Sequence, residues 1–201
     1  MHLSPEHVDA LQELFNIGIG RSAGSLNHML GAPIRLYIPS IRAGKRVELI
    51  RELRLQNESV LSSVLLPFQG SFSGSAYLLF PTDSAAALVA ALTGEYDDKN
   101  NLNSLKEATL TEIGNIVLNG VMGSLSNVLQ HQIFFSVPFY CEIPLQKIIQ
   151  ATSSDSSEVV LWAQTRFTIE EHDISGNIML MLGVPDIGIL LNAIDTLTYP
   201  V

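Results

Sequence analysis

Apolar and polar residues recur along the chain with two different periods, and these periods predict its secondary structure. Helical periodicity predicts a long helix over 5–30, with Ser4 as its N-cap, and a second long helix over about 104–130. Shorter helices are expected at 82–93 and near 186–197. Stretches rich in Val, Leu and Phe between turn residues predict strands at 34–39, within 46–56, and at 59–69, 73–80, 133–139, 142–151, 158–168 and 174–182.

The elements follow the order helix, strands, helix, and this order occurs twice. Such an order favours an α+β fold with mostly antiparallel pairing. The polar run 95–101 is the best candidate for a junction between internal halves of approximately 1–98 and 99–201. Because the junction is short and each half is small, we expect one merged domain over 1–201, with the halves related by a pseudo-twofold axis.

A spaced set of polar residues recurs in the two long helices. In both copies a Glu precedes an Asn by three residues, and the Asn precedes a Pro by 23 residues. The first copy is Glu13, Asn16 and Pro39. The second copy is Glu112, Asn115 and Pro138, which lies 99 residues later. A structural duplication explains this recurrence, so we expect a duplicated unit with two motif-bearing helices.

The recurring residues lie on one polar edge of each helix, because successive residues are rotated by about 100°. The edge of the first helix holds Asp9, Glu13, Asn16, Gly20, Gly24 and Asn27. The edge of the second holds Ala108, Glu112, Asn115, Asn119, Gly123 and Ser126. Glycine inside a helix costs about 1 kcal/mol relative to alanine, so Gly20, Gly24 and Gly123 predict the close approach of another backbone. A solvated helix face or a contact between the two helices would give the same pattern without an active site.

Composition limits the class of protein. Apolar residues make up 47% of the 201 residues and charged residues 15%, so the chain has ample material for a core and is not a disordered protein. The 20 acidic and 11 basic residues give a net charge of −9, which argues against nucleic acid and anionic membranes as partners. The sequence has no uninterrupted apolar run long enough to predict a membrane span, and its first residues lack the pattern of a signal peptide. The single cysteine excludes an intrachain disulfide, and we expect a cytoplasmic protein.

The chemistry available to the repeated residues is limited. The carboxamides of Asn16 and Asn115 do not titrate, so they cannot act as bases or nucleophiles, but they can orient a water molecule. Glu13 and Glu112, one turn away, can pair with a lysine of a partner or act as weak bases. Apart from Asp9, no further carboxylate, histidine or cysteine completes either set. We therefore expect a partner to supply the rest of the active site.

These residues resemble the motif of the CheC/CheX/FliY family of bacterial and archaeal chemotaxis phosphatases. That motif is Asp or Ser, three residues, Glu, two residues, Asn, twenty-two residues and Pro. The first copy fits it completely, with Asp9 in the leading position, whereas the second has Ala108 there. Two copies in a chain of 201 residues resemble CheC, because CheX is shorter and carries one.

The resemblance implies a phosphatase that dephosphorylates the aspartyl phosphate of a CheY-type response regulator in chemotaxis signalling. Asn16 and Asn115 would orient the water that attacks in line, and Glu13 and Glu112 would anchor the regulator. Further contacts with the partner are expected at the remaining edge residues, namely Asp9, Gly20, Gly24, Asn119 and Gly123. The chain would need no cofactor or metal of its own, since the regulator would supply Mg²⁺. The receptor deamidase CheD is a second expected partner.

Another hypothesis is a non-catalytic adaptor that binds a response regulator or CheD. Ala108 favours this hypothesis, as does Phe15, which stands where the family often has glycine before the first Asn. A small-molecule enzyme is disfavoured, because the sequence offers no convergent nucleophile and base.

Overall fold

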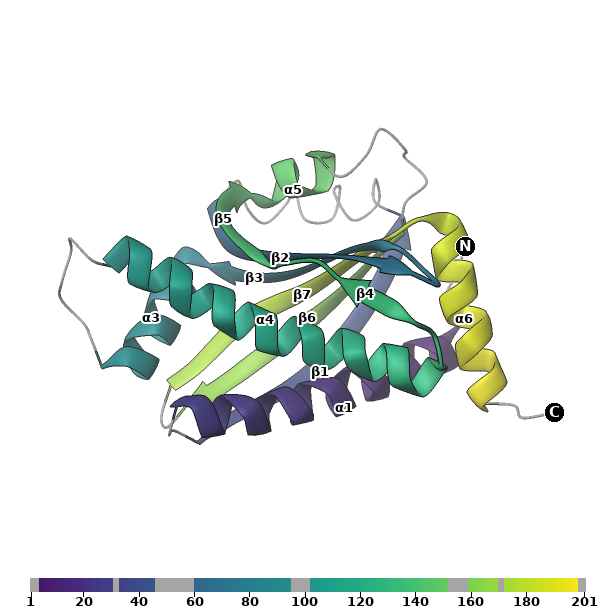
Figure 1. The fold of residues 1–201 in the computed structure, drawn as a ribbon, viewed down its shortest axis with the longest axis horizontal. Helices are drawn as coiled ribbons and strands as arrows, with labels where there is room; N and C mark the ends of the chain where they lie inside the picture. Colours follow the sequence, from purple (N-terminus) through teal and green to yellow (C-terminus); the bar gives the residue numbers. More distant parts are fainter. Residues whose placement is uncertain are drawn as a thin grey trace.

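The computed structural model describes residues 4–30, 33–45, 60–94, 102–151, 159–169 and 172–198, which form an antiparallel sheet with helices packed on it (Figure 1). The helices are α1 (Pro5–Leu30), α3 (Thr82–Thr93), α4 (Leu102–Leu129), α5 (Leu145–Ala151) and α6 (Val184–Thr198). The strands are β1 (Ile34–Lys45), β2 (Val60–Gly70), β3 (Gly74–Pro81), β4 (Ile133–Phe135), β5 (Phe139–Pro144), β6 (Val159–Ile169) and β7 (His172–Leu182). The predicted α+β class with antiparallel pairing is confirmed.

The sheet is built from strands that are distant in sequence. Its order is β1-β6-β7-β3-β2-β4, and β5 pairs with the part of β2 that β4 leaves open. The first strand of each predicted half thus pairs with a strand of the other half, β1 with β6 and β4–β5 with β2. The two halves meet again at the centre, where β3 pairs with β7. Neither half forms a complete sheet by itself.

The pairing registers of the two outer regions correspond. Ile34 of β1 pairs with Ile169 of β6, and a shift of 99 residues converts this pair into Ile133 and Gly70, which also pair. The register of β1 is interrupted after Tyr37, and the shift carries that interruption to the gap between β4 and β5. A duplicated unit would give this correspondence, and the predicted halves stay a prediction. Their proposed junction at 95–101 lies outside the described residues and stays a prediction.

The start of α1 is fixed by the predicted cap. The backbone N–H of His7 donates to Ser4 Oγ at 3.3 Å, and the backbone N–H of Ser4 donates to His7 Nδ1 at the same distance. Two amide groups that the first turn leaves without helical partners are thereby satisfied. His7 Nε2 also lies 2.8 Å from Asp195 Oδ1 of α6, so the cap connects the first helix to the last.

Three predicted strands differ from the structure. The strand predicted at 142–151 ends at Pro144, and α5 follows from Leu145. Proline has no backbone N–H for a sheet ladder, and Leu145 and Ile148 are buried one helical turn apart. The strand predicted at 34–39 continues to Lys45, and the one at 133–139 is interrupted at 136–138. The strand predicted within 46–56 lies outside the described residues.

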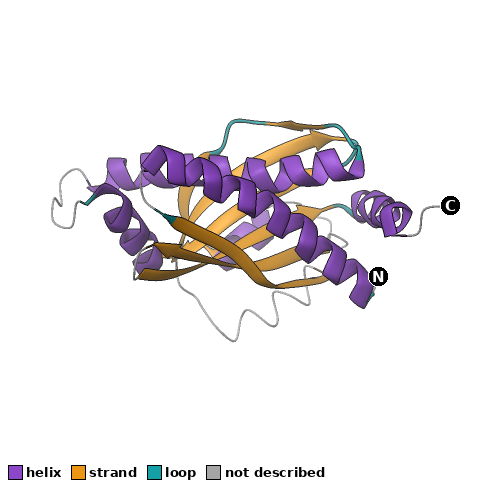
Figure 2. Ribbon diagram, turned by 90° about the horizontal axis from the view of Figure 1, so that it is seen from below, coloured by secondary structure: helices purple, strands orange, loops and turns teal. Residues whose placement is uncertain are grey.

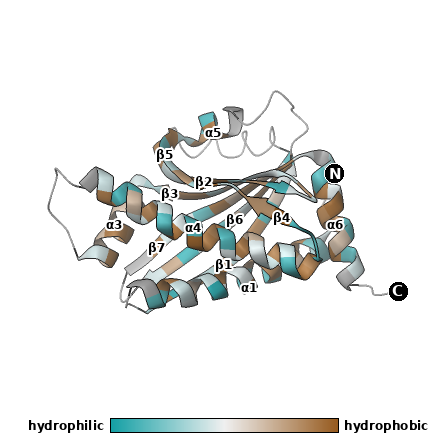
Figure 3. Ribbon diagram, viewed as in Figure 1, coloured by the Kyte–Doolittle hydropathy of each residue, from teal (hydrophilic) through white to brown (hydrophobic). Residues whose placement is uncertain are grey.

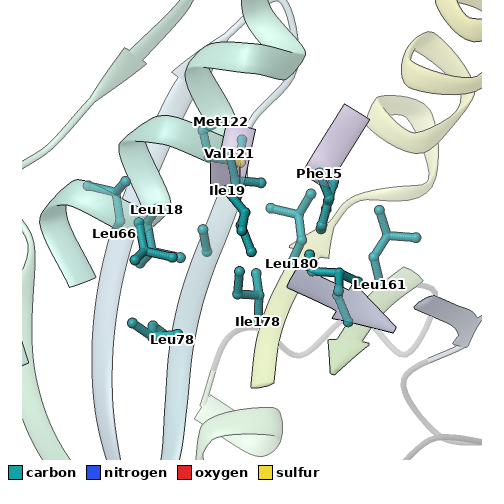
Figure 4. Close-up of a cluster of buried hydrophobic side chains, with 14 of the residues drawn as sticks. Phe15, Ile19, Leu66, Leu78, Leu118, Val121, Met122, Leu161, Ile178 and Leu180 are labelled. Atoms are coloured by element: carbon teal, nitrogen blue, oxygen red, sulfur yellow. The ribbon is translucent and has the colours of Figure 1, made fainter. Parts of the chain in front are cut away.

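Strand residues alternate between the two faces of the sheet. Side chains on both faces are buried. The main core lies between the sheet and the long helices (Figure 4). It includes Phe15, Ile19, Leu66, Leu78, Leu118, Val121, Met122, Leu161, Ile178 and Leu180. A second cluster lies on the opposite face, where α5 packs, and consists of Leu61, Tyr77, Leu79, Leu145, Ile148, Val160, Met179 and Met181. The sheet is therefore the middle layer of three.

Hydropathy follows this arrangement. The strands are largely hydrophobic, whereas hydrophobic and hydrophilic residues are mixed along α1 and α4 (Figure 3). Both helices therefore have one side for the core and one for solvent, as an amphipathic helix on a sheet must. Of the helices in the described ranges, none is both long and apolar enough to span a membrane.

The helices α1 and α4 make backbone contact at two glycines. A Cβ atom on Gly18 would lie 2.6 Å from the carbonyl oxygen of Gly120 and 2.6 Å from Val121 Cα. A Cβ atom on Gly120 would overlap the buried hydroxyl of Ser22. That hydroxyl lies 3.0 Å from Gly18 O and 3.1 Å from Ile116 O, so it can donate to either helix. No larger side chain fits at this crossing.

The glycines predicted to permit close approach are not the ones that do so. A Cβ atom on Gly20, Gly24 or Gly123 would meet nothing within 4 Å. Gly20 is two residues from Gly18 and is therefore rotated by about 200° around the helix, away from the crossing. The prediction that a backbone packs against these three glycines is wrong for this chain in isolation.

Substituting Gly18 by alanine tests the crossing. Because the new methyl group meets backbone atoms that cannot rotate away, Gly18→Ala should lower the free energy of unfolding by about 1–3 kcal/mol. Gly20→Ala is the matched control: it should raise the stability by up to about 1 kcal/mol through helix propensity alone. Urea denaturation followed by circular dichroism measures both. Equal stability of the two variants would contradict the crossing.

Candidate functional site

The two motif-bearing helices lie over the same face of the sheet (Figure 2). The polar edge of each faces outward. On α1, Asp9 and Glu13 are exposed and Asn16 is half-buried. On α4, Glu112 is exposed and Asn115 is half-buried. The predicted acidic and amide side chains are therefore within reach of a partner, although their surroundings differ in the two halves.

Asn16 is bound to the backbone of β1. Its Oδ1 accepts a hydrogen bond from the Ile38 N–H at 2.9 Å, and its Nδ2 donates to the Ile38 carbonyl at 3.4 Å. Gln12, one turn earlier, donates to the same carbonyl at 3.2 Å. Ile38 lies where the pairing of β1 with β6 is interrupted, so these side chains replace the missing strand partner. The distance in sequence from Asn16 to Pro39, which follows Ile38, thus has a structural cause.

Asn115 is held in a different way. Its Oδ1 accepts a hydrogen bond from Asn119 Nδ2 at 2.6 Å. The residue that corresponds to Ile38 is Val137, which is 83% exposed, whereas Ile38 is 2% exposed. Within the part of the chain that the structure describes, the amide N–H groups of Asn115 donate to no protein atom. They remain available to a water molecule or a ligand.

An open pocket of about 380 Å³ lies between the helices beside Asn115. Its lining comes from both halves of the chain and consists of Arg21, Ser22, Ser25, Asn115, Ile116, Asn119 and Gly120. Two predicted site residues, Asn115 and Asn119, are therefore brought together. The other predicted residues, Asp9, Glu13, Asn16, Gly20, Gly24, Glu112 and Gly123, do not line it. Glu112 lies on α4 one turn before Asn115.

Arg21 is a charged residue of the pocket that sequence reasoning missed. It is exposed, and within the described ranges no carboxylate lies within ion-pairing distance of its guanidinium. A signal was present in the repeat itself, because the position 99 residues later is Gly120. A cation in the first copy, where the second copy has a glycine, marks a difference between the copies.

Phe15 does not face a docking partner. Its side chain is 1% exposed and lies in the main core (Figure 4). The corresponding residue of α4 is Gly114, where a Cβ atom would overlap the side chain of Val64 in β2. The choice of residue before each Asn is thus set by packing against the sheet. The interpretation of Phe15 as a feature that favours an adaptor is wrong.

An ionic network anchors the first turns of α4. Lys106 Nζ lies 2.6 Å from Glu142 Oε1 of β5, and the Tyr140 hydroxyl donates to the same oxygen at 2.7 Å. The bond from Lys106, followed by that from Tyr140, lowers the pKa of Glu142. Burial opposes the charge of Lys106, but its bonds to Glu142 and Tyr140 outweigh burial and raise its pKa. The network fixes the helix that carries Glu112 and Asn115 against the edge strand.

The described residues contain no group of three or more His, Cys, Asp or Glu side chains arranged to hold a metal ion. The polar side chains that line the pocket are amides, hydroxyls and one guanidinium. Such groups bind and orient oxygen atoms, and they do so without a change of protonation state.

No protein-family model matches the chain. A curated relative is the CheY-P phosphatase CheC of Bacillus subtilis (strain 168), which is 27% identical over 139 residues, 68% of this chain. The match spans 66% of that relative, just under two thirds of its length.

Three solved structures share the fold. FliY of Thermotoga maritima has a TM-score of 0.76 at 18% identity and covers 98% of this chain and 99% of its own. FliM in the FliG–FliM complex of H. pylori has a TM-score of 0.67 at 13% identity and covers 94% of this chain and 100% of its own. The matching chain of the CheX–CheY–BeF₃–Mg²⁺ complex of Borrelia burgdorferi has a TM-score of 0.54 at 21% identity. It covers 85% of this chain and 96% of its own length. Together with the curated relative, they confirm the predicted resemblance to the CheC/CheX/FliY family.

The two repeated asparagines should differ in their effect on stability. Asn16→Ala leaves the N–H of the buried residue Ile38 without its acceptor, while Gln12 still donates to the Ile38 carbonyl. It should lower the free energy of unfolding by about 1–3 kcal/mol. Asn115→Ala removes only a contact with another half-buried side chain and should change the free energy of unfolding by about 0.5 kcal/mol or less. Denaturant titration of both variants measures the difference. A larger loss for Asn115→Ala would contradict the hydrogen bonds described here.

Proposed function

We propose that this chain, which resembles the CheC/CheX/FliY family, dephosphorylates the aspartyl phosphate of a CheY-type response regulator in chemotaxis signalling. Its Bacillus subtilis relative is a CheY-P phosphatase, and a CheX with the same fold was solved with CheY, beryllium fluoride and magnesium. The observation that carries the proposal is the amide of Asn115, which faces an open pocket with its N–H groups unoccupied by described protein atoms. Such a regulator acts in the cytoplasm, and we place this protein there too.

Asn115 supplies the orientation that hydrolysis needs. The bond from Asn119 fixes its carboxamide and leaves one lone pair of Oδ1 for a water hydrogen, while Nδ2 can donate to a phosphoryl oxygen. The water held in this way attacks phosphorus opposite the aspartyl oxygen, in the in-line geometry of phosphoryl transfer. A bond forms between water oxygen and phosphorus, the bond from phosphorus to the aspartyl oxygen breaks, and inorganic phosphate and a free aspartate result. Any magnesium in this reaction would come from the regulator.

The exposed carboxylates anchor the regulator in this proposal. Glu112 is one turn from Asn115 and faces solvent, so it can pair with a lysine that borders the regulator's phosphorylation site. Glu13 and Asp9 would do the same in the first half. Gly20, Gly24 and Gly123 leave open space above the helices, where the partner's backbone can approach.

The first half would be the slower of the two sites. Asn16 must exchange its bonds to Ile38 for bonds to water and phosphate before it can act. Each intramolecular hydrogen bond is worth about 1 kcal/mol, so this exchange opposes catalysis. Asn115 requires no such exchange with the backbone.

A non-catalytic adaptor that binds a response regulator or CheD is the second candidate. The similarity of the fold to FliM, which was solved in a complex with FliG, favours it, as does the absence of a carboxylate or hydroxyl at Ala108. An adaptor would form the complex but leave the lifetime of the phosphate unchanged.

The decay of a CheY-type receiver phosphorylated with acetyl phosphate tests the proposal. Asn115→Ala should slow hydrolysis at its site by about 10²–10³-fold, the usual effect of removing a group that stabilises the transition state. Asn16→Ala combined with Asn115→Ala should leave only the receiver's spontaneous decay. Asn192→Ala, at an exposed position of α6, is the control and should retain the wild-type rate. Measurements are made below the unfolding transition of the double variant.

Binding distinguishes the two candidates. If the double variant hydrolyses the phosphate at the wild-type rate, the asparagines are not catalytic. If the unaltered protein binds the receiver but does not shorten the lifetime of its phosphate, the adaptor is correct.

A further inference from the structure

Arg21 of α1 lies in the same pocket as Asn115 of α4. It comes from the other half of the chain and reaches the pocket because the helices touch at Gly18 and Gly120. It is the only cationic residue in the described lining. No described carboxylate is close enough to neutralise it. The pocket therefore combines fixed amides with one unpaired positive charge.

A guanidinium in this position suits a phosphoryl group. It stays charged at every physiological pH and presents five N–H donors in a plane that matches two oxygens of a phosphate. During phosphoryl transfer, negative charge is spread over the equatorial oxygens, and an arginine beside them lowers the barrier. The pocket, at about 380 Å³, has room for a phosphoryl group and the attacking water.

The first half has no equivalent of Arg21. The corresponding position of α4 is Gly120, whose lack of a side chain is required by the helix contact. Asn16 is in addition engaged with Ile38. Two independent features, one electrostatic and one conformational, thus distinguish the halves in the same direction.

We propose that Arg21 donates hydrogen bonds to the phosphoryl oxygens of a receiver bound at Asn115, and that it makes the second site the faster one. This inference rests on the proposed function. Arg21 forms no covalent bond and transfers no proton: it stabilises the charge that develops while water replaces the aspartyl oxygen on phosphorus. Asn119 is a positioning residue, which holds the Asn115 carboxamide in place.

The test uses a background in which the first site is disabled without disturbing the fold. Glu13→Lys reverses an exposed charge and leaves the bonds of Asn16 to Ile38 intact. In that background, single-turnover decay of the acetyl phosphate-labelled receiver is measured over a range of protein concentrations. Arg21→Gln should lower the plateau rate about 10–100-fold. This is a smaller effect than the loss of a fully enclosed arginine would have. Arg21→Lys should recover part of the loss, since it keeps the charge but not the planar donors.

Two controls separate the possible results. Arg35→Gln removes an exposed arginine of β1 outside the pocket and should leave the plateau unchanged. Asn115→Ala in the same background reports on the proposed function itself. If Asn115→Ala abolishes hydrolysis but Arg21→Gln keeps the plateau within twofold, the inference about Arg21 is wrong and the proposed function stands. If Asn115→Ala has no effect, the proposed function fails at this site.

The concentration dependence excludes a role in docking alone. An arginine that only attracts the receiver would raise the half-saturating concentration and leave the plateau unchanged, and this result would overturn the proposal. Complete loss of activity in Glu13→Lys alone would overturn it as well, because the second site would then be inactive despite Arg21.

Discussion

The pocket beside Asn115 depends on the contact between the backbones of α1 and α4 at Gly18 and Gly120. Packed helices are ordinarily kept about 8–10 Å apart by their side chains. Here neither position tolerates a Cβ atom, and the Ser22 hydroxyl can donate to either helix. The contact brings residues of one half into the surroundings of the other. Without it, Arg21 and Asn115 would line separate surfaces.

The two similar motifs are unequal because their helices meet different neighbours in the sheet. Each helix packs on the sheet in its own way: Phe15 fills the core beneath α1, whereas Gly114 lets Val64 approach α4. Asn16 is captured by the interrupted strand β1, while Val137 at the corresponding place is exposed. A motif repeated in sequence therefore does not imply a site repeated in function. The neighbours of each Asn decide what its carboxamide can bind.

The sequence was sufficient for α1, α3, α4 and α6, the antiparallel class and the outward position of the acidic edge, because periodicity and capping are local properties. It was insufficient where a residue's role depends on a neighbour far along the chain. Helical spacing identifies a small-residue edge but cannot tell that Gly18, rather than Gly20, meets the other helix. Pro39 indicates an irregular strand, but no local pattern indicates that Asn16 bonds to Ile38 there. The helix after Pro144 was missed for the same reason, since its burial depends on the far face of the sheet.

The exchange of strands between the halves has a consequence for biosynthesis. The residues of β1 pair with β6, and the nearest pair, Lys45 and Val159, is separated by 114 positions in sequence. At about 5–20 residues per second, a ribosome needs roughly 6–23 s to synthesise that interval. During this time β1 has been made but its partner has not, so its edge is open to incorrect pairing. Its exposed arginines, Arg35 and Arg42, are the kind of edge charge that keeps such a nascent strand from associating with another chain.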